Sequence, residues 1–166
     1  IDWWGGSCFG FVQSSFMVWD SIQRFKAAFS DVGPWTANNK LYELPINNDN
    51  RKCINHLMVK QHQSNYWTYR IPLYNQPPTT TLGNLKTMFL DKSNNERGLI
   101  IRNQNGSGGH IVNPYKIIVD SLDSDVEYIY IYDNNWPNDT TRKIKVDKFF
   151  DSWWYNLSGN AGLAAS

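Results

Sequence analysis

The stretch Gly5-Gly6-Ser7-Cys8-Phe9-Gly10-Phe11 places a cysteine behind a flexible glycine-rich lead and at the start of a long amphipathic segment. Apolar residues recur every three or four positions over residues 9–29, which predicts one helix that begins at this cysteine. The apolar face consists of Val12, Phe16, Trp19, Ile22, Phe25 and Phe29. The run Asp31-Val32-Gly33-Pro34 ends the pattern. We therefore expect a buried helix that holds Cys8 rigidly at its first turn.

A cysteine at the start of a helix is placed for nucleophilic chemistry. The first turn leaves backbone N–H groups without intrahelical partners and carries the positive end of the helix dipole. A thiol held there ionises more easily, and the thiolate is the reactive form. The same N–H groups can stabilise the oxyanion of a carbonyl under attack. The alternative for Cys8 is a small buried residue that starts a core helix, because cysteines are often buried.

Length and composition favour a single globular domain over residues 1–166. Hydrophobic residues make up 41% of the chain and charged residues 19%, which excludes a disordered chain. The net charge of +1 leaves no electrostatic footprint for nucleic acid or an anionic membrane, and no apolar run is long enough to span a bilayer. The chain begins at Ile1 rather than at methionine, so we expect a piece of a larger multidomain, exported protein at an extracellular or cell-surface location.

Two cysteines in a chain of this size do not form a disulfide scaffold, although composition leaves a Cys8–Cys53 bridge possible. If Cys8 is catalytic, Cys53 is a buried or incidental thiol. Eight tryptophans and a 15% aromatic share favour a heavy core with some cleft walls, with a sugar-binding surface as the alternative.

The first half of the chain favours helices, expected over residues 9–29, from residue 53 to about 66, and over residues 82–89. Residues 79–81 are expected to be the N-cap region of the last of these helices. The asparagine-rich residues 47–50 favour a loop, and residues 67–71 an extended segment.

The second half favours strands, expected over residues 98–102, 110–119, 127–132 and 143–146. Pro114 implies a bulge or an edge within the second of them. An aromatic segment from Phe149 to Tyr155 closes the chain. A helical part (about 1–95) followed by a sheet part (about 96–166) predicts an α+β fold.

A nucleophilic cysteine needs a histidine and a group that orients the imidazole. His56 and His62 lie six residues apart, share no helical face and have no cluster of Cys, Asp or Glu that would complete a metal site. His110 follows two glycines and opens a strand, whereas Asp133 ends the next one. Antiparallel pairing brings such positions together, so we expect Asp133, or Asn134 beside it, to accept the imidazole N–H.

Three segments in this order resemble the papain-like cysteine peptidases. Residues 6–10 (Gly-Ser-Cys-Phe-Gly) resemble the nucleophile segment of that family. Residues 109–112 (Gly-His-Ile-Val) with Tyr115 resemble its histidine segment, and residues 130–136 (Tyr-Ile-Tyr-Asp-Asn-Asn-Trp) resemble its third segment. About twenty residues carry the resemblance, and they span nearly the whole chain.

The resemblance implies a papain-like fold, in which a helical lobe with the cysteine at a helix N-terminus packs on an antiparallel β lobe with the histidine. It implies hydrolysis of a peptide or protein substrate through an acyl-enzyme, without cofactor or metal. Cys8 would be the nucleophile, His110 the base and later the acid, and Asp133 the orienting group. Asn134 is the rival of Asp133, since bacterial relatives favour Asp and plant-type members Asn, and Trp136 would shield the contact.

One position departs from the family pattern. The family usually has Gln about six residues before the cysteine as an oxyanion donor, whereas this chain has Asp2, and an ionised carboxylate accepts rather than donates. Efficient catalysis is therefore open, and two other classes stay under consideration. They are a transglutaminase-like or amidase enzyme that uses the same triad, and a catalytically weak or inactive papain-like or glycan-binding module.

Overall fold

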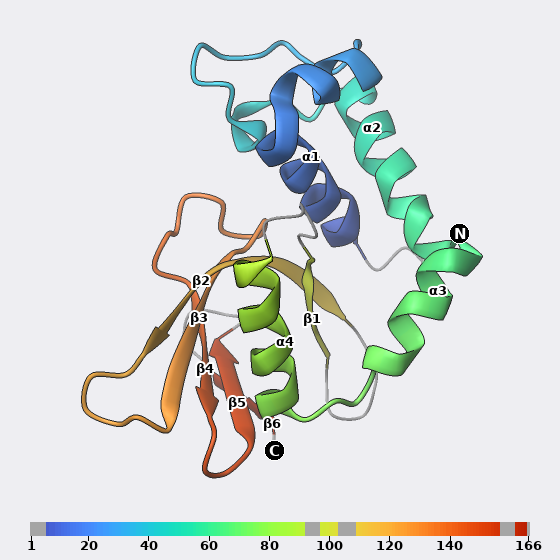
Figure 1. The fold of residues 1–166 in the computed structure, drawn as a ribbon. Helices are drawn as coiled ribbons and strands as arrows, with labels where there is room; N and C mark the ends of the chain where they lie inside the picture. The colour runs from blue at the N-terminus through green and yellow to red at the C-terminus, as the bar shows by residue number, and fades with distance from the viewer. Residues whose placement is uncertain (1–5, 92–96, 103–108, 157–161, 166) are drawn as a thin grey trace. The chain divides into compact units, whose positions relative to one another are not determined.

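The computed structural model describes residues 6–91, 97–102, 109–156 and 162–165 (Figure 1). The chain divides into two compact units, which we call the helical unit (Ile1–Pro72) and the sheet unit (Leu73–Ser166). Helices form the first unit, and one helix with an antiparallel sheet forms the second, which confirms the α+β class. No helix in the described part of the chain is long and apolar enough to cross a bilayer.

Helix α1 (Cys8–Ala28) begins at the cysteine, as predicted, but it is not continuous. Ser21 has extended backbone angles (φ −162°, ψ 106°), and its Oγ accepts the backbone N–H of Arg24 at 3.3 Å. Ser21 thus acts as an N-cap for a second helical segment. The break shifts the helical phase, and the prediction that Trp19 lies on the buried face is wrong, because its side chain is 82% exposed.

Helix α2 (Asn48–Val59) packs against α1 at a glycine. A Cβ atom on Gly10 would lie 2.2 Å from the carbonyl oxygen of Ile54, so only glycine permits this approach. Farther along, the two helices bury a common apolar core around Phe25, Cys53 and Leu57. The cysteine-bearing helix is therefore fixed from one side by α2.

Two asparagines begin α2 and hold the preceding loop. The Asn47 side chain accepts the N–H of Asn50 at 2.8 Å and so caps the helix. The buried Asn50 amide accepts from the N–H of Gly33 and donates to the carbonyl oxygens of Gly33 and Pro45. The prediction of a loop over residues 47–50 and of a helix start at residue 53 is therefore wrong by about five residues.

Four short helical pieces follow in this part of the chain: η1 (Leu41–Glu43), η2 (Lys60–His62), α3 (Ser64–Arg70) and η3 (Ile71–Leu73). The last residue of η3, Leu73, is the first residue of the sheet unit. The prediction of an extended segment over residues 67–71 is wrong, since these residues lie in α3 and at the start of η3. The helix expected from residue 53 to 66 is divided among α2, η2 and α3.

The described residues of the sheet unit form six antiparallel strands, each paired with its neighbours in sequence (Figure 1). They are β1 (Leu99–Ile101), β2 (His110–Val119), β3 (Val126–Tyr132), β4 (Lys143–Asp147), β5 (Ser152–Asn156) and β6 (Gly162–Ala165). The register of β2 against β3 shifts between Pro114 and Lys116, which confirms the bulge expected at the proline.

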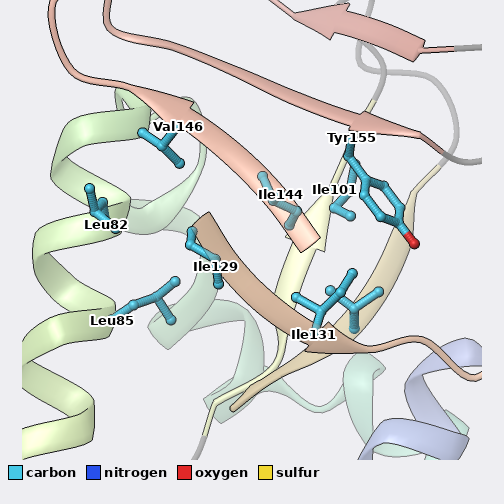
Figure 2. Close-up of a cluster of buried hydrophobic side chains, with 9 residues drawn as sticks. Leu82, Leu85, Ile101, Ile129, Ile131, Ile144, Val146 and Tyr155 are labelled. Carbon is cyan, nitrogen blue, oxygen red and sulfur yellow. The ribbon is translucent and has the colours of Figure 1, made fainter. Parts of the chain in front are cut away.

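Helix α4 (Pro78–Leu90) covers one face of the sheet. Figure 2 shows its Leu82 and Leu85 directed at side chains of the strands. The cluster also contains Ile101, Val112, Ile129, Ile131, Ile144, Val146 and Tyr155. Thr79 is inside the helix rather than before it, which contradicts the N-cap prediction for residues 79–81. Asp151 of the β4–β5 turn performs that role, because its Oδ1 accepts the Thr79 N–H at 2.9 Å and the Thr79 hydroxyl at 2.7 Å.

A buried carboxylate also ties α4 to the sheet. Glu127 lies on the same inner face of β3 as Ile129 and is 1% exposed. Lys86 of α4 lies 2.7 Å from one of its oxygens and Lys148 lies 3.1 Å from the other. Burial alone raises the pKa of Glu127, but the hydrogen bonds and charges of the two lysines outweigh it and lower the pKa.

Candidate active site

The strand register brings His110 and Asp133 together. His110 opens β2 and pairs with Ile101 of β1, whereas Asp133 directly follows Tyr132, the last residue of β3. The Nε2 atom of His110 lies 2.8 Å from Oδ1 of Asp133, and the histidine side chain is 13% exposed. The neighbourhood that antiparallel pairing predicts from the sequence is present in the structure.

Asp133 is fully buried and accepts three hydrogen bonds. Oδ1 accepts from His110 and from the backbone N–H of Asn135 at 2.9 Å. Oδ2 accepts from the hydroxyl of Tyr155, a buried residue of β5. Burial pushes the pKa of Asp133 up, but the bonds from His110, Tyr155 and Asn135 outweigh it and lower the pKa. The carboxylate is therefore held ionised and in one orientation.

This arrangement determines which nitrogen of His110 is basic. A carboxylate at Nε2 requires a proton on that nitrogen, so the bond assigns Nδ1 as the lone-pair nitrogen of the neutral ring. Asn134 does not share the role: the recorded bond of its side-chain N–H runs to the Asn135 side chain, at 3.5 Å. Of the two rivals identified in the sequence, Asp133 contacts His110.

A stacked pair encloses the turn that follows Asp133. The N–H of Trp136 donates to the Asp133 carbonyl oxygen at 2.9 Å, and its ring lies 3.7 Å from the guanidinium carbon of Arg142. Arg142 also donates to the carbonyl oxygen of Asn156 at 2.6 Å and pairs with Asp139 at 3.2 Å. Arg142 therefore fastens the Trp136 turn to the end of β5, the strand that supplies Tyr155.

Cys8 lies in the helical unit, at the first turn of α1, and is half-buried. The first helical bond runs from the N–H of Phe11 to the carbonyl oxygen of Ser7 at 3.1 Å. Within the described residues, the Ser7 side chain makes no capping bond and the first turn of α1 contains no acidic residue.

The second cysteine differs from the first in its surroundings. Cys53 is buried in the core of the helical unit, and burial raises its pKa to about 11. The structure records Cys8 and Cys53 as thiols rather than as a disulfide. At neutral pH the Cys53 thiol is therefore protonated and inert.

The other histidines stand apart from this chemistry. His56 is exposed on α2, where its ring packs against Phe29, and His62 is exposed in η2. Among the described residues, no group of three or more His, Cys, Asp or Glu side chains could hold a metal ion. Two predicted features, Asp2 and Gly108, lie outside the described residues.

An apolar hollow of about 280 Å³ lies between α1, α2 and the loop around η1. Its walls include Phe11, Leu44 and Ile54, and Ser7 lines it beside the cysteine. The hollow is close in size to small ligand pockets and suits an apolar group.

Tyr155 and Arg142 are site residues that the sequence did not reveal. Tyr155 stands in the aromatic run of residues 153–155, where its polarity is not distinctive. The sequence offered one indication: Tyr155 occupies an inward-facing position of β5, and a buried hydroxyl needs a hydrogen-bond partner.

Comparison of the chain with protein-family models, with curated proteins and with solved structures found no match.

Proposed function

We propose that this chain is a papain-like cysteine peptidase that hydrolyses peptide bonds with Cys8, His110 and Asp133. The observation that carries the proposal is the buried Asp133 carboxylate bonded to Nε2 of His110 at 2.8 Å. In the proposed triad, Nδ1 is therefore the nitrogen that would exchange a proton with the thiol. The helix start at Cys8 supplies the second half of the chemistry, because it favours a thiolate.

In the proposed reaction, the Cys8 thiol transfers its proton to His110, and the thiolate attacks the peptide carbonyl carbon. The C–N bond breaks as the imidazolium protonates the leaving amine, which leaves a thioester on Cys8. Water then gives a proton to His110 and attacks the thioester, and the carboxylic acid leaves as the thiol is restored. Asp133 stays ionised throughout and stabilises the imidazolium.

The backbone N–H groups of the first turn of α1 are the proposed oxyanion donors. The N–H groups at the start of a helix point beyond the helix end, which is the end at which Cys8 lies. This assignment needs no donor from residue 2, where the family pattern has Gln and this chain has Asp2.

The substrate class follows from the same features. The apolar hollow beside Ser7 supports peptides with an apolar residue near the bond that is cut. We place the domain, as a proposal, in a larger protein at an extracellular or cell-surface location, where peptide or protein substrates are available.

Labelling with a peptidyl vinyl sulfone, located by mass spectrometry, tests the proposal. At pH 7 we expect modification of Cys8 in the wild type and in Cys53→Ser, and none in Cys8→Ser. We expect His110→Ala to lower the labelling rate by about 10²-fold or more, because general-base catalysis contributes about 10²–10⁴-fold. A peptide library, cut with and without an added amine, separates hydrolysis from acyl transfer by the mass of the products.

The matched cysteine variants make the result decisive. Absence of labelling at Cys8 in a folded wild type would contradict both hydrolysis and acyl transfer and leave a binding module. Labelling that is equally fast in His110→Ala would show that the thiol reacts without the imidazole, which is incompatible with the proposed pair.

A further inference from the structure

Tyr155 contributes a hydroxyl to the site that the proposed reaction does not use. That hydroxyl bonds to Oδ2 of Asp133, the oxygen that does not face His110. We infer that Tyr155 is a positioning residue, which fixes the Asp133 carboxylate and sets the pH range over which His110 keeps its proton. The consequence for catalysis rests on the proposed function, whereas the effect on His110 does not.

The ring of Tyr155 is held too firmly to act as a mobile donor. It is 1% exposed and packs in the core of the sheet unit beside Ile101 and Ile144. Figure 2 shows the hydroxyl oxygen at the end of the ring that points away from Leu82 and Leu85. Strand β5 pairs with β4 up to Trp154, which fixes the backbone next to Tyr155. The hydroxyl is therefore directed at Asp133 by the core itself.

The hydroxyl also keeps its proton at every pH at which an enzyme works. Burial raises the pKa of Tyr155, and the bond to the Asp133 carboxylate raises it further. Tyr155 is thus a permanent donor, and Asp133 a permanent acceptor, across the range in which histidine titrates.

A donor on Oδ2 weakens the attraction of the carboxylate for the His110 proton. The negative charge of Asp133 is shared among His110, Tyr155 and the N–H of Asn135. Removal of the Tyr155 hydroxyl leaves more of that charge on the imidazolium, which then releases its proton at a higher pH.

The described groups around Tyr155 include aliphatic side chains and one arginine. Elements α4, β1 and β4 contribute aliphatic side chains to this core. The charged group that approaches from the β3–β4 connection is Arg142, whose guanidinium carbon is 5.9 Å from the Tyr155 ring centre and which pairs with Asp139. Replacement of Tyr155 by Phe leaves these groups in place, so a changed titration of His110 reports on the hydroxyl.

The test is an NMR titration of the His110 ring in the full chain, with the resonance assigned by His110→Gln. In Tyr155→Phe we expect the midpoint to rise by about 0.5–1 pH unit, because the imidazolium gains part of the charge-assisted interaction that the hydroxyl gives up. Tyr130→Phe is the matched control, since this residue lies on β3 with its ring against Tyr115 and Lys116, and it should leave the midpoint unchanged. The alkaline limb of the vinyl sulfone labelling profile should move in the same direction.

An unchanged His110 midpoint in a folded Tyr155→Phe would overturn the inference and make Tyr155 a packing residue only. If this variant does not fold, the wild type decides: a slowly exchanging Tyr155 hydroxyl proton near Asp133 supports the inference, and rapid exchange overturns it. A shifted midpoint without any labelling of Cys8 supports the positioning role and refutes the proposed peptidase, so the two failures are distinguishable.

Discussion

Cys8 lies at the end of a helix, whereas His110 and Asp133 lie at the ends of two paired strands. In the helical unit, the backbone holds Cys8 in place, through the first turn of α1 and the close packing of that helix at Gly10. In the sheet unit, hydrogen bonds hold the side chain of Asp133 in place, since three donors meet on its carboxylate. Function and stability should therefore be separable at Cys8 and inseparable at Asp133.

The largest effect expected from this difference is seen when each residue is truncated. Asp133→Ala leaves three donors without their acceptor, among them the buried hydroxyl of Tyr155, and should lower the free energy of unfolding of the sheet unit by about 3 kcal/mol or more. Cys8→Ala places the best helix former at a half-buried position and should cost less than about 1 kcal/mol. Amide hydrogen exchange, followed separately in the two units, measures both values. Equal losses of unfolding free energy in Asp133→Ala and Cys8→Ala would contradict this difference between the two units.

Adding a methyl group at a glycine should instead destabilise the helical unit and not the sheet unit. Gly10→Ala drives a Cβ into the Ile54 carbonyl and should cost the helical unit about 2–3 kcal/mol and slow the labelling of Cys8. Gly83→Ala is the control in α4 of the sheet unit, where an added Cβ meets nothing within 4 Å. It should stabilise that unit by about 0.5–1 kcal/mol. A stabilised Gly10→Ala, seen by exchange in α2, would show that α1 and α2 do not meet closely there.

The two units also differ in how far the sequence predicted them. The strands can be recognised from the alternation of apolar and polar residues and from the turns between them. Each strand pairs with the next one along the chain, so the order of the strands was enough to predict that His110 lies near Asp133. Helices in the first unit depend on longer-range packing. The Asn47–Asn50 run has loop composition, but Asn47 caps α2 and Asn50 is buried under the loop that it holds.

Single side chains decided the other differences. The Ser21 hydroxyl accepts a hydrogen bond from the backbone N–H of Arg24, and α1 is divided there. Any serine in a helix can form such a local bond, so the spacing of apolar residues does not reveal which serine will interrupt the helix. Tyr155 reaches Asp133 from β5, 22 positions away, a contact that only the assembled sheet defines. The pattern of apolar residues predicts which elements exist, whereas polar side chains determine where they break and what they hold.

The smallest expected difference between the two units is in how their stability falls in mild acid. Asp133 and Glu127 have pKa values held below their ordinary 3.8 and 4.5, so their stabilisation is complete above those values and is lost as the pH falls through the lowered ones. Each group changes the free energy of unfolding by at most about 1.4 kcal/mol per pH unit. The effect on the sheet unit at pH 4 should therefore stay below about 1 kcal/mol and grow toward pH 3.

The helical unit supplies the internal reference for that titration. Its ion pairs, such as Lys52–Asp49 and Arg24–Asp20, are on the surface and contribute little. Exchange rates measured from pH 5 to pH 3, corrected for intrinsic chemistry, should show a steeper loss in the sheet unit, and Glu127→Gln should remove part of that slope. Equal slopes in both units would mean that the buried carboxylates titrate as they do in the unfolded chain, and that the Asp133 network does not hold its charge.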